Sequence, residues 1–309
     1  MTIAGFDIPV LVAMLMVAST PILLAAIGEL VAEKAGVLNL GVEGMMIIGA
    51  ICGFAAAVGT GNPYLGMAGA AAGGALISVI FAWLTLYLLS NQVATGLALT
   101  MFGLGLSALL GQSYQGIKPP PTGALNLGPL AEIPVLGRML FQHDIWVYAS
   151  LAIVAGVWWW LGRTRAGLRL RAIGENPDAA HALGYRVKRT RFLAIMFGGA
   201  LAGMGGGYLS LIRVPQWTEG MTAGAGWIAL AIVVFASWRP WRAVLGAYLF
   251  GGITVLQLSF QARGIAIPVQ ILSMAPYLIT ILVLVLISAG RGRALGAPAS
   301  LGRVFQSSR

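Results

Sequence analysis

The sequence predicts an all-α membrane protein that crosses the bilayer about nine times. Of the 309 residues, 59% are apolar and only 9% are charged, whereas charged residues make up about 25% of an ordinary soluble domain. Residues 44–117 contain no Asp, Glu, Lys or Arg at all. Because a helix needs about 20 apolar residues to cross a bilayer, this run has room for several spans. The composition excludes a soluble globular enzyme.

Turn-forming residues divide the apolar runs into helices of membrane-spanning length. Within the longest run, Asn62-Pro63 and Ser90-Asn91-Gln92 are typical turn sequences. We therefore predict a single transmembrane domain over residues 1–309, with eight to ten spans, one of them broken by glycines. The nine best-delimited spans are 8–28, 37–61, 64–89, 92–112, 145–162, 192–212, 221–238, 243–261 and 268–289.

Basic residues predict the orientation of these spans. The chain has 19 Lys and Arg residues against 9 Asp and Glu, and residues 163–191 alone hold eight of the basic ones. Since short cytoplasmic loops are enriched in Lys and Arg, we expect this loop and the C-terminus to be cytoplasmic. Nine spans place the N-terminus outside, but it is cytoplasmic if residues 37–61 do not cross. The bases lie between apolar runs, where they meet anionic membrane lipids and not nucleic acid.

The sequence lacks the residues that several kinds of chemistry require. Residues 111–118 come nearest to a Walker A motif but lack its Gly-Lys-Ser/Thr ending. One cysteine, Cys52, and two histidines, His143 and His181, cannot form a disulfide framework or a His/Cys metal cluster. No nucleophile with an adjacent base is evident. We therefore expect no enzyme activity, no cofactor and no ATP hydrolysis in this chain alone.

The loop at 163–191 contains the signature of a short helix near residues 176–184. Asn176 is a favourable N-cap, and Pro177 suits the first helical position. Gly184 suits the position that ends a helix. A two-turn helix is marginal in water unless it packs against something. Two interpretations are open: a connector at the membrane surface, or a projection that docks into a groove of another protein.

Glycines and polar residues interrupt one of the predicted spans. Within residues 36–44, Asn39 and Glu43 are polar and three positions are glycine. An ionisable group at mid-bilayer costs about 2.5–3.5 kcal/mol on insertion scales, and interrupted spans line substrate pathways in many transporters. The alternative is a glycine-rich packing bend with Glu43 near the cytoplasmic boundary. A second glycine-rich stretch, at 220–226, hints at an internal repeat.

These stretches are similar to the permease subunits of bacterial ATP-binding-cassette (ABC) importers. The resemblance is to the branch that holds ribose, branched-chain amino acid and nucleoside permeases, and is closest to the nucleoside (simple-sugar-type) group. It covers nearly the whole chain. Its most specific strings are EKAGVLNLGVEGMM at 33–46 and GENPDAA at 174–180, with weaker matches at 19–26, 91–99 and 226–231.

The resemblance implies that the chain is one permease subunit of an importer powered by a separate ATPase. In that family the cytoplasmic loop helix docks into the ATPase subunit, and this role falls on Glu175, Asn176, Pro177, Ala180 and Gly184. The implied partners are a pair of ABC ATPase subunits, a second, related permease subunit and an external solute-binding protein, often a lipoprotein. ATP is then used by the partner subunit, and the expected location is the bacterial inner membrane.

We expect the solute to be a nucleoside that crosses by alternating access through a central cavity. An uncharged nucleoside needs an aromatic face and amide or hydroxyl partners, and the candidate pathway residues are Asn39, Glu43, Asn91, Gln92 and Thr95. The alternatives are an ABC permease for a sugar or a branched-chain amino acid, an autonomous channel or ion-driven carrier, and a membrane-embedded enzyme. Glu43 is the only ionisable residue that we expect to be buried, which disfavours an ion-driven carrier.

Overall fold

The computed structural model describes residues 2–3, 6–125, 128, 131, 133–262, 274, 278, 281, 282, 285 and 296–306. Two short strands near the N-terminus, β1 (Thr2–Ile3) and β2 (Phe6–Asp7), pair antiparallel. The helices are α1 (Ile8–Lys34), α2 (Val42–Thr60), α3 (Pro63–Leu86), α4 (Gln92–Gly111), the 3-10 turn η1 (Gln112–Tyr114), α5 (Leu136–Leu140), α6 (Ile145–Arg163), α7 (Arg165–Glu175), α8 (Pro177–Ala182), α9 (Val187–Tyr208), the π-helical turn η3 (Leu209–Arg213), α10 (Ala225–Phe235) and α11 (Pro240–Ala262).

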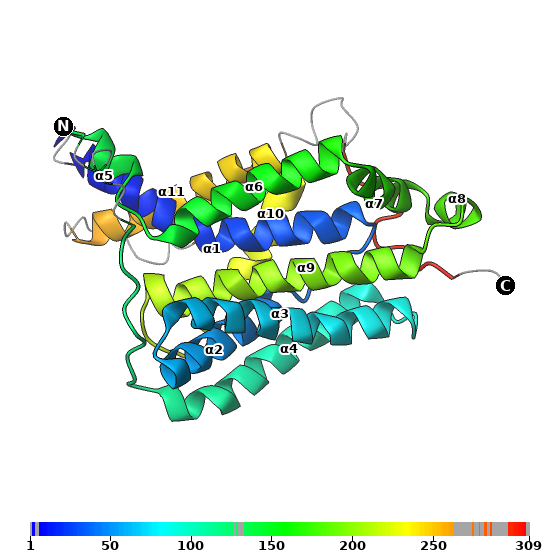
Figure 1. Ribbon diagram of the computed structural model, residues 1–309, viewed down its shortest axis with the longest axis horizontal. Coiled ribbons are helices and arrows are strands. Elements are labelled where there is room, and N and C mark those ends of the chain that lie inside the picture. Colours follow the sequence, from blue (N-terminus) through cyan, green and yellow to red (C-terminus); the bar gives the residue numbers. More distant parts are fainter. Residues whose placement is uncertain are drawn as a thin grey trace.

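The long helices run side by side along the longest axis of the molecule (Figure 1). α7, α8 and the C-terminal residues 296–306 lie together at one end of this bundle. We call it the basic end, because the Arg and Lys residues of 163–191 belong to it. The N-terminus and α5 lie at the opposite end.

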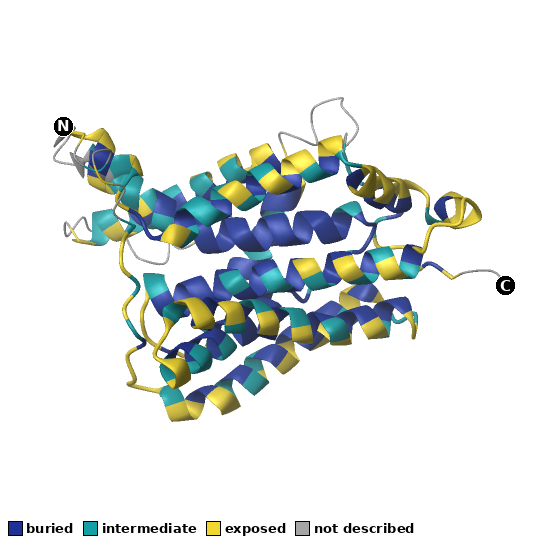
Figure 2. Cartoon of the chain, in the orientation of Figure 1, coloured by how far each residue is buried: buried dark blue, intermediate teal, exposed yellow. Residues whose placement is uncertain are grey.

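Burial differs sharply between the inner and outer helices. From Ala18 to Glu33 every residue of α1 is buried, which places this helix in the core (Figure 2). α4 and α6 are buried on one face only, and their outer faces carry large apolar side chains such as Met101 and Trp159. Apolar residues on the outside of a bundle are typical of helices that face lipid.

Glycines let the central helices approach backbone to backbone. A Cβ at Gly203 of α9 would overlap the carbonyl oxygen of Ala70 in α3 and lie 2.9 Å from the Cα of Gly74. On another face of the same helix, a Cβ at Gly206 would overlap the carbonyl oxygen of Met46 in α2. Because lipid gives no hydrophobic drive for helices to associate, such close backbone contacts provide much of the packing energy.

Seven helices in the described residues are long and apolar enough to cross a membrane. They correspond to seven predicted spans and confirm the multi-span helical fold, although the first extends to Lys34 and the second begins only at Val42. The predicted span at 221–238 is wrong in length. α10 has only 11 residues, about 16 Å of helix, against a hydrocarbon core of about 30 Å. The predicted span at 268–289 lies outside the described residues, apart from isolated positions.

The interruption predicted in the second span is a turn at residues 35–41 between α1 and α2. The backbone N–H of Asn39 donates to Oε1 of Glu29 at 3.1 Å, and Glu29 lies more than one helical turn before the end of α1. The chain therefore folds back beside α1 before α2 starts. A comparable turn at 219–224 precedes α10.

Replacing Gly203 with Val should destabilise the bundle, because the new side chain would overlap the backbone of α3. Overpacking of this kind costs about 1–3 kcal/mol. We expect a lower midpoint of thermal aggregation, measured by fluorescence-detected gel filtration in detergent. Gly105→Val is the matched control, because a Cβ at Gly105 of α4 meets no atom within 4 Å. Equal losses in the two variants would contradict the packing described here.

Candidate solute pathway and coupling region

The carboxylate of Glu43 joins the two glycine-rich stretches of the sequence. Its Oε1 accepts hydrogen bonds from the Thr222 hydroxyl at 2.5 Å and the Gly224 N–H at 2.9 Å, and its Oε2 accepts one from the Gly226 N–H at 2.6 Å. Glu43 is only 4% exposed. The three donors surround the N-terminus of α10, where the helix dipole favours negative charge. Glu43 thus caps a helix whose first N–H groups need partners.

Two glycines make this cap possible. Gly224 has a φ of +86°, a conformation that costs a glycine little. At Gly226, a Cβ would lie only 2.6 Å from the Cα of Glu43. The two interrupted helices therefore meet at their N-terminal ends, an arrangement that transporters use to build solute and ion sites.

A cavity of about 720 Å³ lies beside this cap, between α1, α11 and the residues that lead into α10. This volume is typical of small-molecule sites. Thr222 lines the cavity, and its hydroxyl donates to Glu43, so Glu43 lies one hydrogen bond from a residue of the cavity wall. The side chains that can hydrogen-bond to a solute there are those of Gln142, His143, Arg213, Thr222 and Thr254.

The sequence-based choice of pathway residues missed these side chains. Arg213 ends a charge-free run and Thr222 lies within the second glycine-rich stretch, so both positions carried a usable signal. Gln142 and His143 come from the long connection before α6, and Thr254 comes from within α11. Nothing in their local sequence distinguishes these three from ordinary polar residues.

Asn39 and Gln92, two of the predicted pathway residues, are buried and hold the turn at 35–41. The side-chain oxygen of Asn39 accepts the N–H of Gly41 at 3.0 Å. The side-chain oxygen of Gln92 accepts the N–H of Leu38 at 2.8 Å. Since both amides already bind backbone groups, the geometry gives them a positioning role, and a contact with the solute stays a prediction.

Asn91 and Thr95, two further predicted residues, belong to the start of α4. The Asn91 side chain caps this helix by accepting the N–H groups of Val93 and Ala94 at 3.0 and 3.1 Å. The Thr95 hydroxyl shares a 2.8 Å hydrogen bond with that of Ser90. Neither residue is among those that line the 720 Å³ cavity, and their contact with the solute likewise stays a prediction.

The expectation that Glu43 is the only buried ionisable residue is wrong. The other buried ones in the described residues include Glu29, Glu33, Asp144 and Arg191. The indole N–H of Trp238 donates to Glu33, and the Tyr208 hydroxyl donates to Asp144 at 2.8 Å. The first pair connects α1 to the turn between α10 and α11, and the second connects α9 to the N-cap of α6, so buried ionisable groups serve the fold here. A count of buried charges therefore does not separate an ion-driven carrier from a permease.

α8 (Pro177–Ala182) projects at the basic end of the bundle (Figure 1). The side-chain oxygen of Asn176 accepts the N–H of Ala179 at 3.0 Å, and Pro177 occupies the first helical position. After the helix, Gly184 has a φ of +83°, and its N–H donates to a carbonyl of the last turn at 2.8 Å. These are the positions that Asn, Pro and Gly favour at helix ends.

One face of α8 is anchored and its tip is exposed. Ala180 is buried in an apolar cluster with Ile173, Val187 and Phe305. Leu183, by contrast, is 77% exposed. Ala180, which the family resemblance links to docking, thus packs against the chain itself. Leu183 offers an apolar side chain that a groove on another protein could accept.

The C-terminal residues 296–306 bind along the end of α7. The Glu175 carboxylate accepts the N–H of Ala299 at 3.3 Å. The N–H and the hydroxyl of Ser300 both donate to the carbonyl of Gly174, at 3.0 and 2.6 Å. Glu175, which the resemblance also links to docking, therefore holds this C-terminal segment.

Arg191 connects the same segment to the membrane helices. Its Nε donates to the carbonyl of Ala35 at 3.0 Å, its Nη1 to the carbonyl of Arg303 at 3.2 Å, and its Nη2 to the Ser300 hydroxyl at 3.0 Å. The side chain is only 1% exposed. One guanidinium thus joins α9, the turn at 35–41 and the C-terminal segment.

Direct backbone contact reinforces this junction. A Cβ at Gly174 in α7 would overlap the carbonyl oxygen of Lys34, the last residue of α1. Gly36 has a φ of +87°, and a Cβ there would lie 2.7 Å from Nη2 of Arg191. α7 therefore touches the end of α1 without an intervening side chain, so we expect a movement of α7 to displace α1 or the turn after it.

Comparison with known proteins identifies the kind of molecule that carries this site. The family model described as the permease component of branched-chain amino acid transport systems matches residues 11–289. The chain belongs to this permease family. The match includes both glycine-rich stretches, α7, α8 and Arg191.

Individual relatives cover nearly all of the permease. It is 42% identical over 290 residues to the putative glucose ABC transporter permease protein TsgC13 of Haloferax volcanii (86% of this chain, 88% of the relative). It is 34% identical over 284 residues to the guanosine ABC transporter permease protein NupQ of Bacillus subtilis (87% and 89%). It is also 34% identical over 290 residues to the nucleoside ABC transporter permease protein NupC of Lactococcus lactis subsp. cremoris (90% and 92%).

These findings confirm the resemblance on which the sequence prediction rested. The chain is a multi-pass membrane permease of the ABC transporter type, and it serves a small polar solute. As a permease subunit of this family, it is a transporter component without an ATPase site of its own.

Replacing Glu43 with Ala should destabilise the permease, because buried donors at the start of α10 lose their acceptor. Each such donor costs about 1–3 kcal/mol, and we expect a lower thermal unfolding midpoint in detergent. Glu219→Ala is the control, since Glu219 lies in the same connection and is exposed. In a double-mutant cycle, Glu43→Ala and Thr222→Val should be non-additive by at least about 0.5 kcal/mol. Strict additivity would mean that this hydrogen bond does not form.

Replacing Arg191 with Lys should release residues 296–306, because an ammonium group cannot reach three acceptors as the planar guanidinium fork does. Each hydrogen bond to a charged group is worth about 1.5–3 kcal/mol, so trypsin cleavage after Arg303 should accelerate about tenfold or more. Mass spectrometry of the released peptide measures the rate. Arg189→Lys, at an exposed position of α9, should cleave as the wild type does. Unchanged cleavage in the Arg191 variant would contradict the junction.

Proposed function

We propose that this permease is one transmembrane subunit of an ATP-driven importer of nucleosides. A separate ATPase subunit docks on α8 and the exposed Leu183, and the 720 Å³ cavity beside Glu43 forms part of the solute pathway. The observation that carries the proposal is the anchored projection at the basic end. Its inner face packs on the permease through Ala180, while Leu183 is left without cover.

A movement of the docked ATPase would reach the cavity through a short series of contacts. α8 continues directly from α7, and α7 abuts the end of α1 at Gly174. Arg191 ties the turn at 35–41 to the same region. This turn leads into α2, where Glu43 holds Thr222 at the cavity wall. ATP binding and hydrolysis belong to the partner subunit in this proposal, and the permease needs no cofactor.

Charge supports a cytoplasmic location for the basic end. Residues 163–191 hold eight Lys and Arg, and such loops are retained on the cytoplasmic side. The C-terminal segment lies at the same end. The opposite end would then face an external solute-binding protein. A second, related permease subunit would complete the pathway in a bacterial inner membrane.

The choice of a nucleoside rests on the relatives and on the cavity. Two relatives are named as guanosine and nucleoside permeases. The cavity offers amide, imidazole, hydroxyl and guanidinium groups, which suit an uncharged solute with many hydrogen-bonding groups. A sugar is the second candidate, because the 42% identical relative is named as a putative glucose permease.

Replacing Leu183 with Asp should detach the ATPase, because a charge would replace an apolar anchor in the docking groove. When the tagged permease is purified with its coexpressed ATPase, we expect at least about tenfold less ATPase to be retained. Val304→Asp is the control: Val304 is 45% exposed at the same end of the molecule, and its variant should retain the ATPase. Stoichiometric retention by the Leu183 variant would contradict docking at α8.

The solute can be tested separately in proteoliposomes that contain the complete transporter and its binding protein. Excess unlabelled guanosine should suppress the uptake of labelled guanosine, whereas excess glucose should leave it unchanged. Uptake of glucose without uptake of guanosine would overturn the nucleoside assignment and would favour the sugar.

A further inference from the structure

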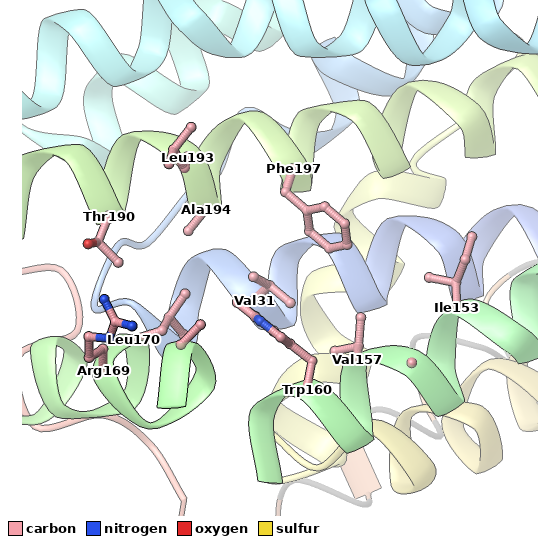
Figure 3. A pocket seen from close by; sticks show the side chains of 12 residues that line it. Val31, Ile153, Val157, Trp160, Arg169, Leu170, Thr190, Leu193, Ala194 and Phe197 are labelled. Atoms are coloured by element: carbon pink, nitrogen blue, oxygen red, sulfur yellow. The ribbon is translucent and has the colours of Figure 1, made fainter. Parts of the chain in front are cut away.

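A groove of about 620 Å³ runs between α6 and α9, with α1 behind it (Figure 3). Val31 of α1 forms its floor. Its two walls are apolar, and they are formed by Ile153, Val157 and Trp160 of α6 and by Leu193, Ala194 and Phe197 of α9.

The groove lies on an apolar part of the surface. Leu193 on its rim is 56% exposed, and the neighbouring Trp159 of α6 is 57% exposed. From Ile153 to Trp160, and again from Thr190 to Phe197, the walls follow about 10 Å of helix. Both helices are long and apolar enough to cross a membrane, so the groove runs from the basic end along two helices of membrane-spanning length.

Arg169 of α7 lies at the basic end of the groove, beside Thr190 (Figure 3). It is the one charged side chain among the twelve described residues of the lining, and there is no carboxylate among them. Its Nε donates to the carbonyl of Arg165 at 3.4 Å, which leaves the two Nη groups to bind a ligand. Arg169 is exposed and belongs to α7, which follows the membrane-length helix α6 at its basic end.

We propose that this groove binds an anionic phospholipid, with one acyl chain between α6 and α9 and the phosphate at Arg169. An apolar groove that ends in a guanidinium matches a ligand with an apolar tail and an anionic head. Arg binds phosphate oxygens with its planar fork, and basic pockets between helices attract anionic headgroups. An acyl chain in the groove also supplies packing partners that the walls otherwise lack.

The bound lipid would hold α7 against α6 and α9. α7 leads directly into α8, so the lipid would lie beside the helix that connects the projection to the membrane domain. The proposal concerns the surface of this chain, and it does not depend on which solute is carried.

Native mass spectrometry of the full-length permease, titrated with phosphatidylglycerol or phosphatidylcholine in mild detergent, tests the proposal. The wild type should bind phosphatidylglycerol more tightly. Arg169→Gln should weaken that binding about fivefold, the factor expected for one basic residue. Arg171→Gln is the matched control, since position 171 faces a different side of α7 and does not line the groove.

A second pair of variants tests whether the apolar part of the groove binds the acyl chain. Gly156 lines the groove, and a Cβ there meets no atom within 4 Å, so Gly156→Leu should fill the groove without disturbing the fold and should weaken lipid binding. Gly162→Leu is the control on the same helix, because its Cβ also meets nothing and it lies outside the groove.

Three results would overturn the proposal. The first is unchanged binding of phosphatidylglycerol in both Arg169→Gln and Gly156→Leu. The second is equal affinity of the wild type for the two lipids. The third is a photocrosslink from a probe at Leu193, in membranes, to another protein subunit and not to lipid.

Discussion

The guanidinium of Arg191 is the point at which three separate parts of the permease meet. Arg191 belongs to the first turns of α9, and it binds the turn after α1 through the carbonyl of Ala35 and the C-terminal segment through acceptors that include the hydroxyl of Ser300. A buried charge is costly unless its donors are paired. Moving any of the three parts away would leave donors of Arg191 unpaired, so this side chain holds the three parts together. The geometry of the basic end, and the position of α7 and α8 there, depend on these hydrogen bonds.

A second buried charge organises the middle of the molecule in a similar way. Glu43 binds the N-terminus of α10, and the turn at 35–41 separates it from the region that Arg191 controls. Arg191 therefore contacts one end of a short segment, the turn at 35–41 with the start of α2, and Glu43 lies at its other end. We infer that this segment relays movement between α8 and the cavity. A physical network of this kind is a route for coupling, and coupling itself must be measured.

Local patterns in the sequence predicted local structure well, but they could not predict the contacts between distant segments. The charge-free runs located seven of the spans, and the residue types at 176, 177 and 184 predicted the ends of α8. Arg191, however, resembled one more base of a cytoplasmic loop, and the bonds of Glu43 to the start of α10 were not predicted, while its contact with the solute stays a prediction. Their partners are fixed by backbone approaches at glycines such as Gly36 and Gly226, and these approaches depend on how whole helices pack.

In the proposed function this chain is a gate that a separate ATPase moves. The most direct test is uptake of labelled guanosine into proteoliposomes that contain either the permease subunits alone or the complete transporter with ATP. We predict uptake only with the complete transporter, and only when ATP can be hydrolysed. Guanosine flux through the permease subunits alone, unaffected by ATP or the ATPase, would contradict it.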